Sequence, residues 1–197
     1  DFVTEMITGI DLVKEQINVA RGNKLSFTQD ELEIRGHSIE LRVCTEDPLN
    51  NFLPDTGRLE MYQIPKGPGV RIDDGYEEGM DIPIFYDPMI AKLIVHAATR
   101  EEAINRLCRA IDEYQIKGIK TTLQFGKWAV QTEQFRSGNF DTKFIDKHFK
   151  PEYLIDHDAA GAEIAAILAE CSWEKDKKTE ATVTESGQIS KWKINRG

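Results

Sequence analysis

Two oppositely charged side chains, Glu40 and Arg42, stand two residues apart within an alternating stretch of the sequence. Successive side chains of a β-strand point to opposite faces, so this spacing predicts that both project from one face, roughly 7 Å apart along the strand. A strand holds a charge more rigidly than a loop does, and a catalytic charge requires that rigidity. The pattern alone favours a plainer interpretation, a solvent-exposed charge pair on an antiparallel sheet.

The strand that carries this pair is predicted over residues 31–44. An apolar face alternates with a polar face along it: His37, Ile39, Leu41 and Val43 against Ser38, Glu40, Arg42 and Cys44. Pro48 limits the strand, because proline has no backbone N–H to donate to a neighbouring strand.

The same periodicities predict the elements around this strand. Apolar stripes at helical spacing predict helices after the capping residues Asp11, Thr99 and Thr121 or Thr122, and another through about Phe149. Alternation predicts three further strands, at residues 58–64, from residue 70 and at 89–97. The acidic pair Asp73-Asp74 before Gly75 predicts a solvated turn in preference to a metal site. Strands covered by helices, without regular βαβ alternation, indicate an α+β fold with a mainly antiparallel sheet.

The composition changes near Lys150. Residues 1–150 are predicted to form one domain, and residues 151–197 a helical connector and linker that leads to a further domain. Within this second part, the pattern favours a helix over 159–171, a linker over 174–187 and a strand over 188–194.

Charge and cysteine content exclude several classes of protein. The net charge of −9 argues against nucleic acid as a partner, because phosphate binding requires a basic surface. No apolar run approaches the length of a membrane span, which argues against a membrane protein. The three cysteines are far apart without metal-ligand spacing, which indicates reduced thiols in the cytoplasm, or in the mitochondrial matrix of a eukaryote. Because the sequence begins at Asp1 without Met, we expect a piece of a longer protein.

Longer motifs extend the stretch around Glu40. Residues 40–48 read Glu-x-Arg-x-x-x-Glu-Asp-Pro, and residues 67–71 read Gly-Pro-Gly-Val-Arg. Together with residues 3–13, 86–93 and 116–122, these blocks resemble the C-terminal domain of biotin carboxylase, in the order found in that family. Biotin carboxylase is the ATP-dependent component of acetyl-, propionyl- and methylcrotonyl-CoA carboxylases and of pyruvate carboxylase. One departure is Asp1-Phe2, where the family usually has His-Pro.

The resemblance implies a role for each candidate residue. Arg42 matches the arginine that holds the ureido oxygen of biotin during carboxylation, and we infer that Glu40 orients it. Asp87 matches an acid with a structural role near the site, and Ile116 would contact the adenine of ATP. Arg71 matches a residue at the subunit contact of a homodimer, although a hairpin turn that ends in a solvated arginine explains its position equally well.

The resemblance also implies cofactors and partners. The complete enzyme uses ATP, Mg²⁺ and biotin, and the biotin is attached to a carrier domain that also serves a carboxyltransferase component. This sequence contains neither a Gly-rich phosphate loop nor the acidic metal ligands of an ATP-grasp lobe, so the chain alone is expected to bind no cofactor and to be inactive. The final acceptor stays open between acetyl-CoA, propionyl-CoA, methylcrotonyl-CoA and pyruvate. The alternative function is a non-catalytic scaffold or dimerisation module of the same fold.

Overall fold

The computed structural model describes residues 1–83, 85, 87–155 and 167–169. The chain divides into two compact units, residues 1–155 and 156–197, and the fold below is that of the first unit. Of the second unit, residues 167–169 are helical. The rest of the predicted helix at 159–171, and all of the predicted linker and last strand, lie outside the described residues. The predicted domain boundary after residue 150 therefore stays a prediction.

A three-stranded antiparallel sheet forms the centre of the first unit. Its strand order is β1-β8-β6, with β1 at His37–Cys44, β8 at Met89–Ala97 and β6 at Val70–Asp74. The predicted strand at 89–97 and the strand expected from residue 70 are both present. With its helices packed on antiparallel strands, the unit has the α+β fold that the sequence predicts.

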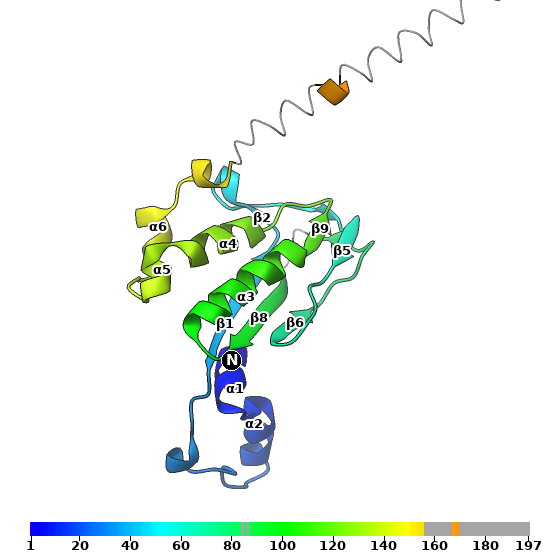
Figure 1. The fold of residues 1–197 in the computed structure, drawn as a ribbon. Helices are drawn as coiled ribbons and strands as arrows, with labels where there is room; N and C mark the ends of the chain where they lie inside the picture. Colours follow the sequence, from blue (N-terminus) through cyan, green and yellow to red (C-terminus); the bar gives the residue numbers. More distant parts are fainter. Residues whose placement is uncertain (84, 86, 156–166, 170–197) are drawn as a thin grey trace, which may run out of the picture. The chain divides into compact units, whose positions relative to one another are not determined.

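Helix α3 (Arg100–Glu113) lies across β1 and β8 and covers one face of the sheet (Figure 1). The Thr99 hydroxyl accepts a hydrogen bond from the Glu102 N–H at 3.2 Å, so the predicted cap is present. The apolar stripe of α3 meets the alternate residues of both strands, and these side chains are buried: Ile39, Val43, Leu93, Val95, Ile104, Leu107 and Ile111. Burial of each such side chain contributes roughly 1.5–3 kcal/mol, which anchors β1 on its apolar side.

The first strand is shorter than predicted. It begins at His37, because residues Gln29–Glu31 form a 3₁₀ turn (η1). This turn is closed by a capping box in which the Thr28 backbone N–H donates to the Glu31 carboxylate at 2.7 Å. The predicted start of the strand at residue 31 is therefore too early.

The predicted strand at residues 58–64 is wrong as a single element. The strand β4 (Gly57–Arg58) pairs with β7 (Asp81–Ile82), whereas β5 (Met61–Gln63) pairs with β9 (Gln115–Lys117). Leu59, fully buried between them, is bonded through its N–H to the Met80 carbonyl at 2.9 Å. The segment changes partner at this point and does not join the central sheet.

The predicted turn at Asp73-Asp74 is also wrong. Both residues belong to β6, where Asp73 stands opposite Lys92 and Asp74 stands opposite Ala91 of β8. The favourable pairing of Asp73 with basic neighbours outweighs the local turn preference of the acidic pair.

Helix α4 (Leu123–Gln131) packs on α3 and on β1. Thr122 stands at its N-cap position, as predicted, but the Thr122 hydroxyl makes no capping hydrogen bond to the helix. In the middle of α4, Gly126 lies against Leu41 of β1. A Cβ atom at Gly126 would approach the Leu41 Cδ2 atom to 2.6 Å, so any other residue there would force the Leu41 side chain to shift.

Shorter elements complete the unit. The helix predicted through about Phe149 is α6 (Phe144–His148), and two short helices were not predicted, α1 (Phe2–Thr8) and α5 (Glu133–Ser137). The aromatic rings of Phe52, Phe125, Trp128 and Phe149 pack together beside α6, with centroids 4.9–5.9 Å apart. The remaining elements are α2 (Leu12–Ala20), β2 (Glu46–Asp47), η2 (Pro48–Asn50), β3 (Leu53–Pro54) and η3 (Pro151–Leu154).

Candidate functional site

Glu40 and Arg42 project from the same face of β1, opposite the face that α3 covers. The Arg42 Nε atom lies 3.6 Å from Glu40 Oε1, and their side chains are 71% and 16% exposed. A contact of this length is a loose ion pair, which contributes little to stability. The arrangement leaves the guanidinium of Arg42 open to solvent and free to bind an anionic ligand.

The strand register adds three more charged groups to this face. Arg42 and Asp73 both stand opposite Lys92 of the central strand β8, and Glu40 and Arg71 both stand opposite Ile94. Cross-strand partners project from the same face of an antiparallel sheet. Arg42, Lys92 and Arg71 therefore form a basic group on one sheet face, partly balanced by Glu40 and Asp73. The alternation of β8 in the sequence could have placed Lys92 on one face of its own strand, but not opposite Arg42.

Arg71 is held within its own chain. Its guanidinium donates to both Asp73 carboxylate oxygens, from Nε at 2.8 Å and from Nη2 at 2.9 Å. It also lies 4.6 Å from the ring centroid of Phe2 and 4.0 Å from a carboxylate oxygen of Glu5, both on α1. Its side chain stays 42% exposed, so a contact to a second copy of the protein is sterically open. Its role as a dimer residue stays a prediction.

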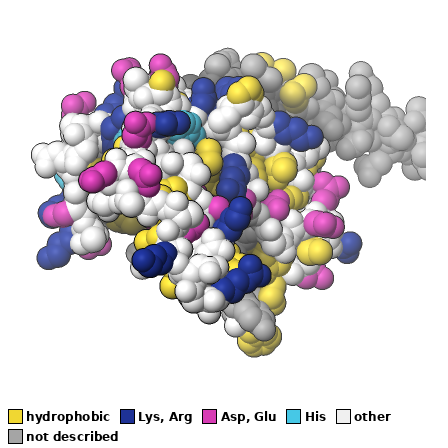
Figure 2. Space-filling view, turned by 90° about the horizontal axis from the view of Figure 1, so that it is seen from below, with side chains coloured by type: hydrophobic (Ala, Val, Ile, Leu, Met, Phe, Trp, Pro, Cys, Tyr) yellow, Lys and Arg dark blue, Asp and Glu magenta, His cyan; other side chains and the backbone are white. Residues whose placement is uncertain are grey.

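Figure 2 views the end of the unit at which α1 and α2 lie, and shows Lys and Arg side chains among hydrophobic and acidic ones. Part of the hydrophobic surface comes from α2, where Val13 is 60% and Ile17 is 47% exposed. Apolar side chains at helical spacing usually cover a neighbouring element.

Asp87 precedes β8, and its carboxylate accepts a hydrogen bond from the Met89 N–H at 2.9 Å. Burial, and next the charge of Asp87, raise the pKa of Glu46. Burial also raises the pKa of the Cys44 thiol to about 11, with Glu46 and Asp87 adding to it and Arg42 opposing it. These effects place Asp87 among the charges beside the end of β1, and they make Cys44 a protonated, unreactive thiol at neutral pH.

Ile116 lies in β9, opposite Tyr62 of β5, and is partly buried against the core. Lys120, four residues later, contacts Asp47 and Asp55 in the segment that follows β1. The Lys120 ammonium lies 2.5 Å from Asp47 Oδ2, and its backbone N–H donates to Asp55 Oδ2 at 2.6 Å. The hydrogen bond from Lys120 is the main cause that lowers the pKa of Asp47.

Replacing Lys120 by methionine should lower the melting temperature at neutral pH and have a smaller effect in acid. Because the folded-state pKa of Asp47 is lowered, its stabilisation is present above its unfolded pKa, about 3.9, and is lost as the pH falls through the folded value. Thermal unfolding of wild type and variant at several pH values measures this difference. Lys24→Met is the control, since Lys24 forms no ion pair among the described residues. An unchanged difference at the most acidic pH would contradict the assignment.

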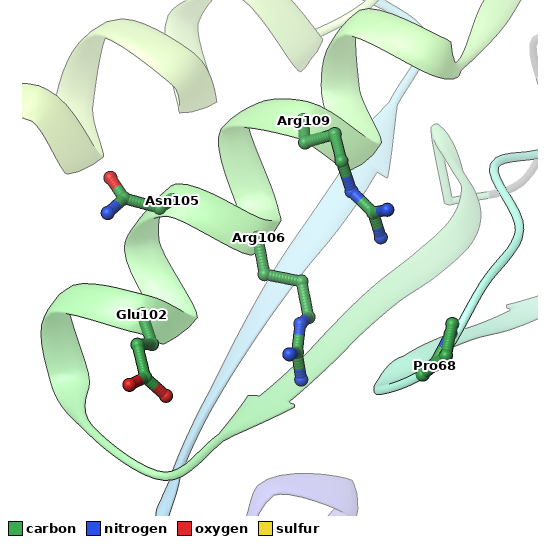
Figure 3. A pocket seen from close by; sticks show the side chains of 5 residues that line it. All are labelled: Pro68, Glu102, Asn105, Arg106 and Arg109. Atoms are coloured by element: carbon green, nitrogen blue, oxygen red, sulfur yellow. The ribbon is translucent and has the colours of Figure 1, made fainter.

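A pocket of about 480 Å³ lies between α3 and the loop at residues 67–69. Figure 3 shows Arg106 and Arg109 extending from α3 toward Pro68, with Glu102 nearer the start of the helix. The Arg106 guanidinium donates to the His96 carbonyl oxygen, which fixes the Arg106 side chain at the end of the central strand β8. The loop predicted to lie near a subunit contact is thus bordered by two arginines of α3.

Among the residues that the structure describes, no group of three or more His, Cys, Asp or Glu side chains could hold a metal ion. No helix within the same residues is long and apolar enough to cross a membrane.

Comparison with known proteins identifies the family. The family model of the biotin carboxylase C-terminal domain matches residues 40–147. A pyruvate carboxylase component from Methanothermobacter thermautotrophicus is 51% identical over 146 residues, which are 74% of this chain and 30% of that protein. Biotin carboxylase 1 of Bacillus subtilis is 48% identical over 146 residues, which are 74% of this chain and 32% of that protein.

A solved structure shows the same fold. The biotin carboxylase domain dimer of Hydrogenobacter thermophilus 2-oxoglutarate carboxylase, in complex with MgADP, ADP and bicarbonate, matches with a TM-score of 0.74 at 39% identity. The match covers 79% of this chain and 34% of that chain. This chain belongs to the biotin carboxylase family, and its matched region is the C-terminal domain of that family. It spans about a third of the length of the curated relatives.

Proposed function

We propose that this chain is the C-terminal part of an enzyme that carboxylates biotin at the expense of ATP and bicarbonate, and that Arg42 binds the reacting biotin. The observation that carries the proposal is the placement of Arg42 on the central sheet. Its backbone is anchored by a buried strand, while its guanidinium is 71% exposed beside a mostly buried carboxylate. A side chain that binds an anionic substrate needs a rigid backbone and a solvent-accessible positive charge, and Arg42 has both.

The chemistry explains why an arginine is required. Biotin accepts a carboxyl group at a ureido nitrogen, and loss of the proton from that nitrogen leaves an enolate-like anion with charge on the ureido oxygen. A guanidinium that stays charged at neutral pH, with a planar fork of donors, stabilises that oxygen. The Glu40 carboxylate, 3.6 Å from Arg42 Nε, limits the orientations of the guanidinium. Lys92, which stands opposite Arg42 on β8, adds a second positive charge on the same face.

The remaining roles belong to the whole protein. ATP and Mg²⁺ would be held mainly by other parts of the enzyme, with Ile116 at the adenine, and Asp87 would keep the end of β1 in place. The partners are a biotin carrier domain, a carboxyltransferase component and a second copy of the enzyme, the last in contact through Arg71. Support for the second copy comes from the Hydrogenobacter thermophilus relative, which forms a dimer.

The complete protein that contains this chain should label free biotin from radioactive bicarbonate, in a reaction that depends on ATP. The 197-residue chain alone should show neither this labelling nor bicarbonate-dependent ATP cleavage, because its described residues hold no cluster of metal-binding acids. The assay measures labelled carboxybiotin and released phosphate in parallel. Activity of the chain alone would contradict the proposal, and an inactive but folded complete protein would favour a scaffold.

A further inference from the structure

The outer edge of β1 has a partner other than a strand. In the sheet order β1-β8-β6, β8 pairs with only one edge of β1. The backbone groups on the other edge, at Arg42 and Cys44, meet Thr122. The Thr122 hydroxyl donates to the Arg42 carbonyl oxygen at 3.1 Å and accepts from the Cys44 N–H at 3.0 Å. The Thr122 N–H donates to the Cys44 carbonyl oxygen at 3.0 Å.

These hydrogen bonds lie where the strand pairing is irregular. The register between β1 and β8 shifts between Val43 and Cys44, directly after Arg42. Thr122 bridges the two residues that flank Val43, and it is only 7% exposed, so water does not readily replace its hydroxyl. An unpaired backbone group at a buried site is costly, which makes this bridge a specific constraint on the strand.

Two further observations distinguish Thr122 from an ordinary helix cap. A threonine at an N-cap normally accepts a hydrogen bond from its own helix, whereas the Thr122 hydroxyl makes no such bond. Among the described residues, both hydrogen bonds of this hydroxyl go to β1. One turn later, Gly126 lets α4 rest directly on Leu41, the residue between Glu40 and Arg42. Helix α4 therefore holds β1 on both sides of Arg42.

We propose that Thr122 is a positioning residue for Arg42, and this inference rests on the proposed function of Arg42. Within the described part of the chain, the one ion pair of the Arg42 side chain is the loose contact to Glu40, so the position of the guanidinium depends on the Arg42 backbone. A displacement of about 1 Å at a reacting group can slow an enzyme by roughly a hundredfold. The Thr122 hydroxyl prevents such a displacement by fixing the Arg42 carbonyl and the next outward-facing N–H.

Thr122→Val keeps the shape of the side chain and removes both of its hydrogen bonds to β1. In the complete carboxylase, we expect the kcat for biotin carboxylation to fall about tenfold, while bicarbonate-dependent ATP cleavage without biotin changes less than about twofold. Thr122→Ser, which keeps the hydroxyl, should restore the wild-type rate. Equal losses in both reactions, or no rescue by serine, would overturn the inference.

A matched control lies at the other end of α4. The Thr132 hydroxyl also donates to one backbone carbonyl, of Ala129, and accepts from one N–H, of Phe135, and neither bond involves β1. Thr132→Val should leave both partial reactions unchanged. If Thr122→Val folds poorly, Gly126→Ala tests the same point by pressing on Leu41, and it should also slow biotin carboxylation selectively. A matching loss from Thr132→Val, or a non-selective loss from Gly126→Ala, would count against Thr122 as a positioning residue.

A double variant separates this inference from the proposed function. If Thr122 acts through Arg42, then Thr122→Val should have no further effect on biotin carboxylation once Arg42 is alanine. The same tenfold loss in that background would overturn the inference and leave the role of Arg42 intact. If Arg42→Ala alone leaves biotin carboxylation unchanged, the role proposed for Arg42 is wrong, and the inference falls with it.

Discussion

Replacing Arg42 by alanine in the complete carboxylase should slow biotin carboxylation by about a hundredfold, equivalent to roughly 3 kcal/mol of lost transition-state stabilisation. The reason is that the ureido oxygen of biotin loses its fixed cation. Binding of ATP and bicarbonate should persist, because in the proposed enzyme both are held mainly by parts outside this chain. The measurement compares biotin carboxylation with bicarbonate-dependent ATP cleavage in the absence of biotin.

Arg42→Lys is the matched control for charge. An ammonium on a flexible stem keeps the positive charge but not the planar fork, so lysine should restore only part of the rate. The free energy of unfolding should change by at most about 1 kcal/mol in either variant, since the contact with Glu40 is long and the Arg42 side chain is 71% exposed. A parallel fall of both reactions, or an unfolded variant, would show that Arg42 is a structural residue.

Gly118→Ala should destabilise the fold by about 2–5 kcal/mol, the sum of a conformational cost and a steric one. Gly118 has a φ of 96°, a left-handed conformation that costs a residue with a Cβ atom about 1–2 kcal/mol. The new Cβ would also overlap the Arg58 carbonyl oxygen and lie 3.1 Å from the Glu60 nitrogen. These neighbours are backbone atoms that cannot rotate away, so overpacking adds about 1–3 kcal/mol. Denaturant unfolding of the 197-residue chain measures the loss.

Gly138→Ala isolates the conformational part of this effect. Gly138 has a similar positive φ of 76°, but nothing lies within 4 Å of the Cβ position. It should therefore lose only the roughly 1–2 kcal/mol of backbone strain. Equal losses in the two variants would show that the contact between Gly118 and the 58–60 segment relaxes freely.

The local sequence pattern predicted correctly those strands and helices that are buried along one continuous face. β8 and α3 are buried along one face for their whole length, so alternation and the apolar stripe located them well. The segment at 58–64 also alternates, but Arg58 pairs with Asp81 while Met61 pairs with Lys117. The partner of each half is set by residues distant in the sequence. Alternation within so short a segment therefore cannot predict that the partner changes.

Of the charged residues on this sheet face, only Glu40 and Arg42 could be predicted from the sequence to lie together. The spacing of Glu40 and Arg42 was enough to place them on one face, and the structure bears this out. Lys92 and Asp73 join them through the register of three strands, which a sequence does not specify. Thr122 was expected as a helix cap, but its hydroxyl forms tertiary hydrogen bonds in place of the local one.

The placement of Arg42 and Arg71 on one sheet face couples two sites that were predicted separately. They lie on β1 and β6, two strands and two residues apart, so strand spacing and rise put their backbones roughly 12 Å from each other. This separation is close to the Debye length of about 10 Å at 0.1 M salt. A charged partner that docks at Arg71 would therefore alter the electrostatic potential at Arg42 in dilute buffer, whereas counterions would largely isolate the two arginines in concentrated salt.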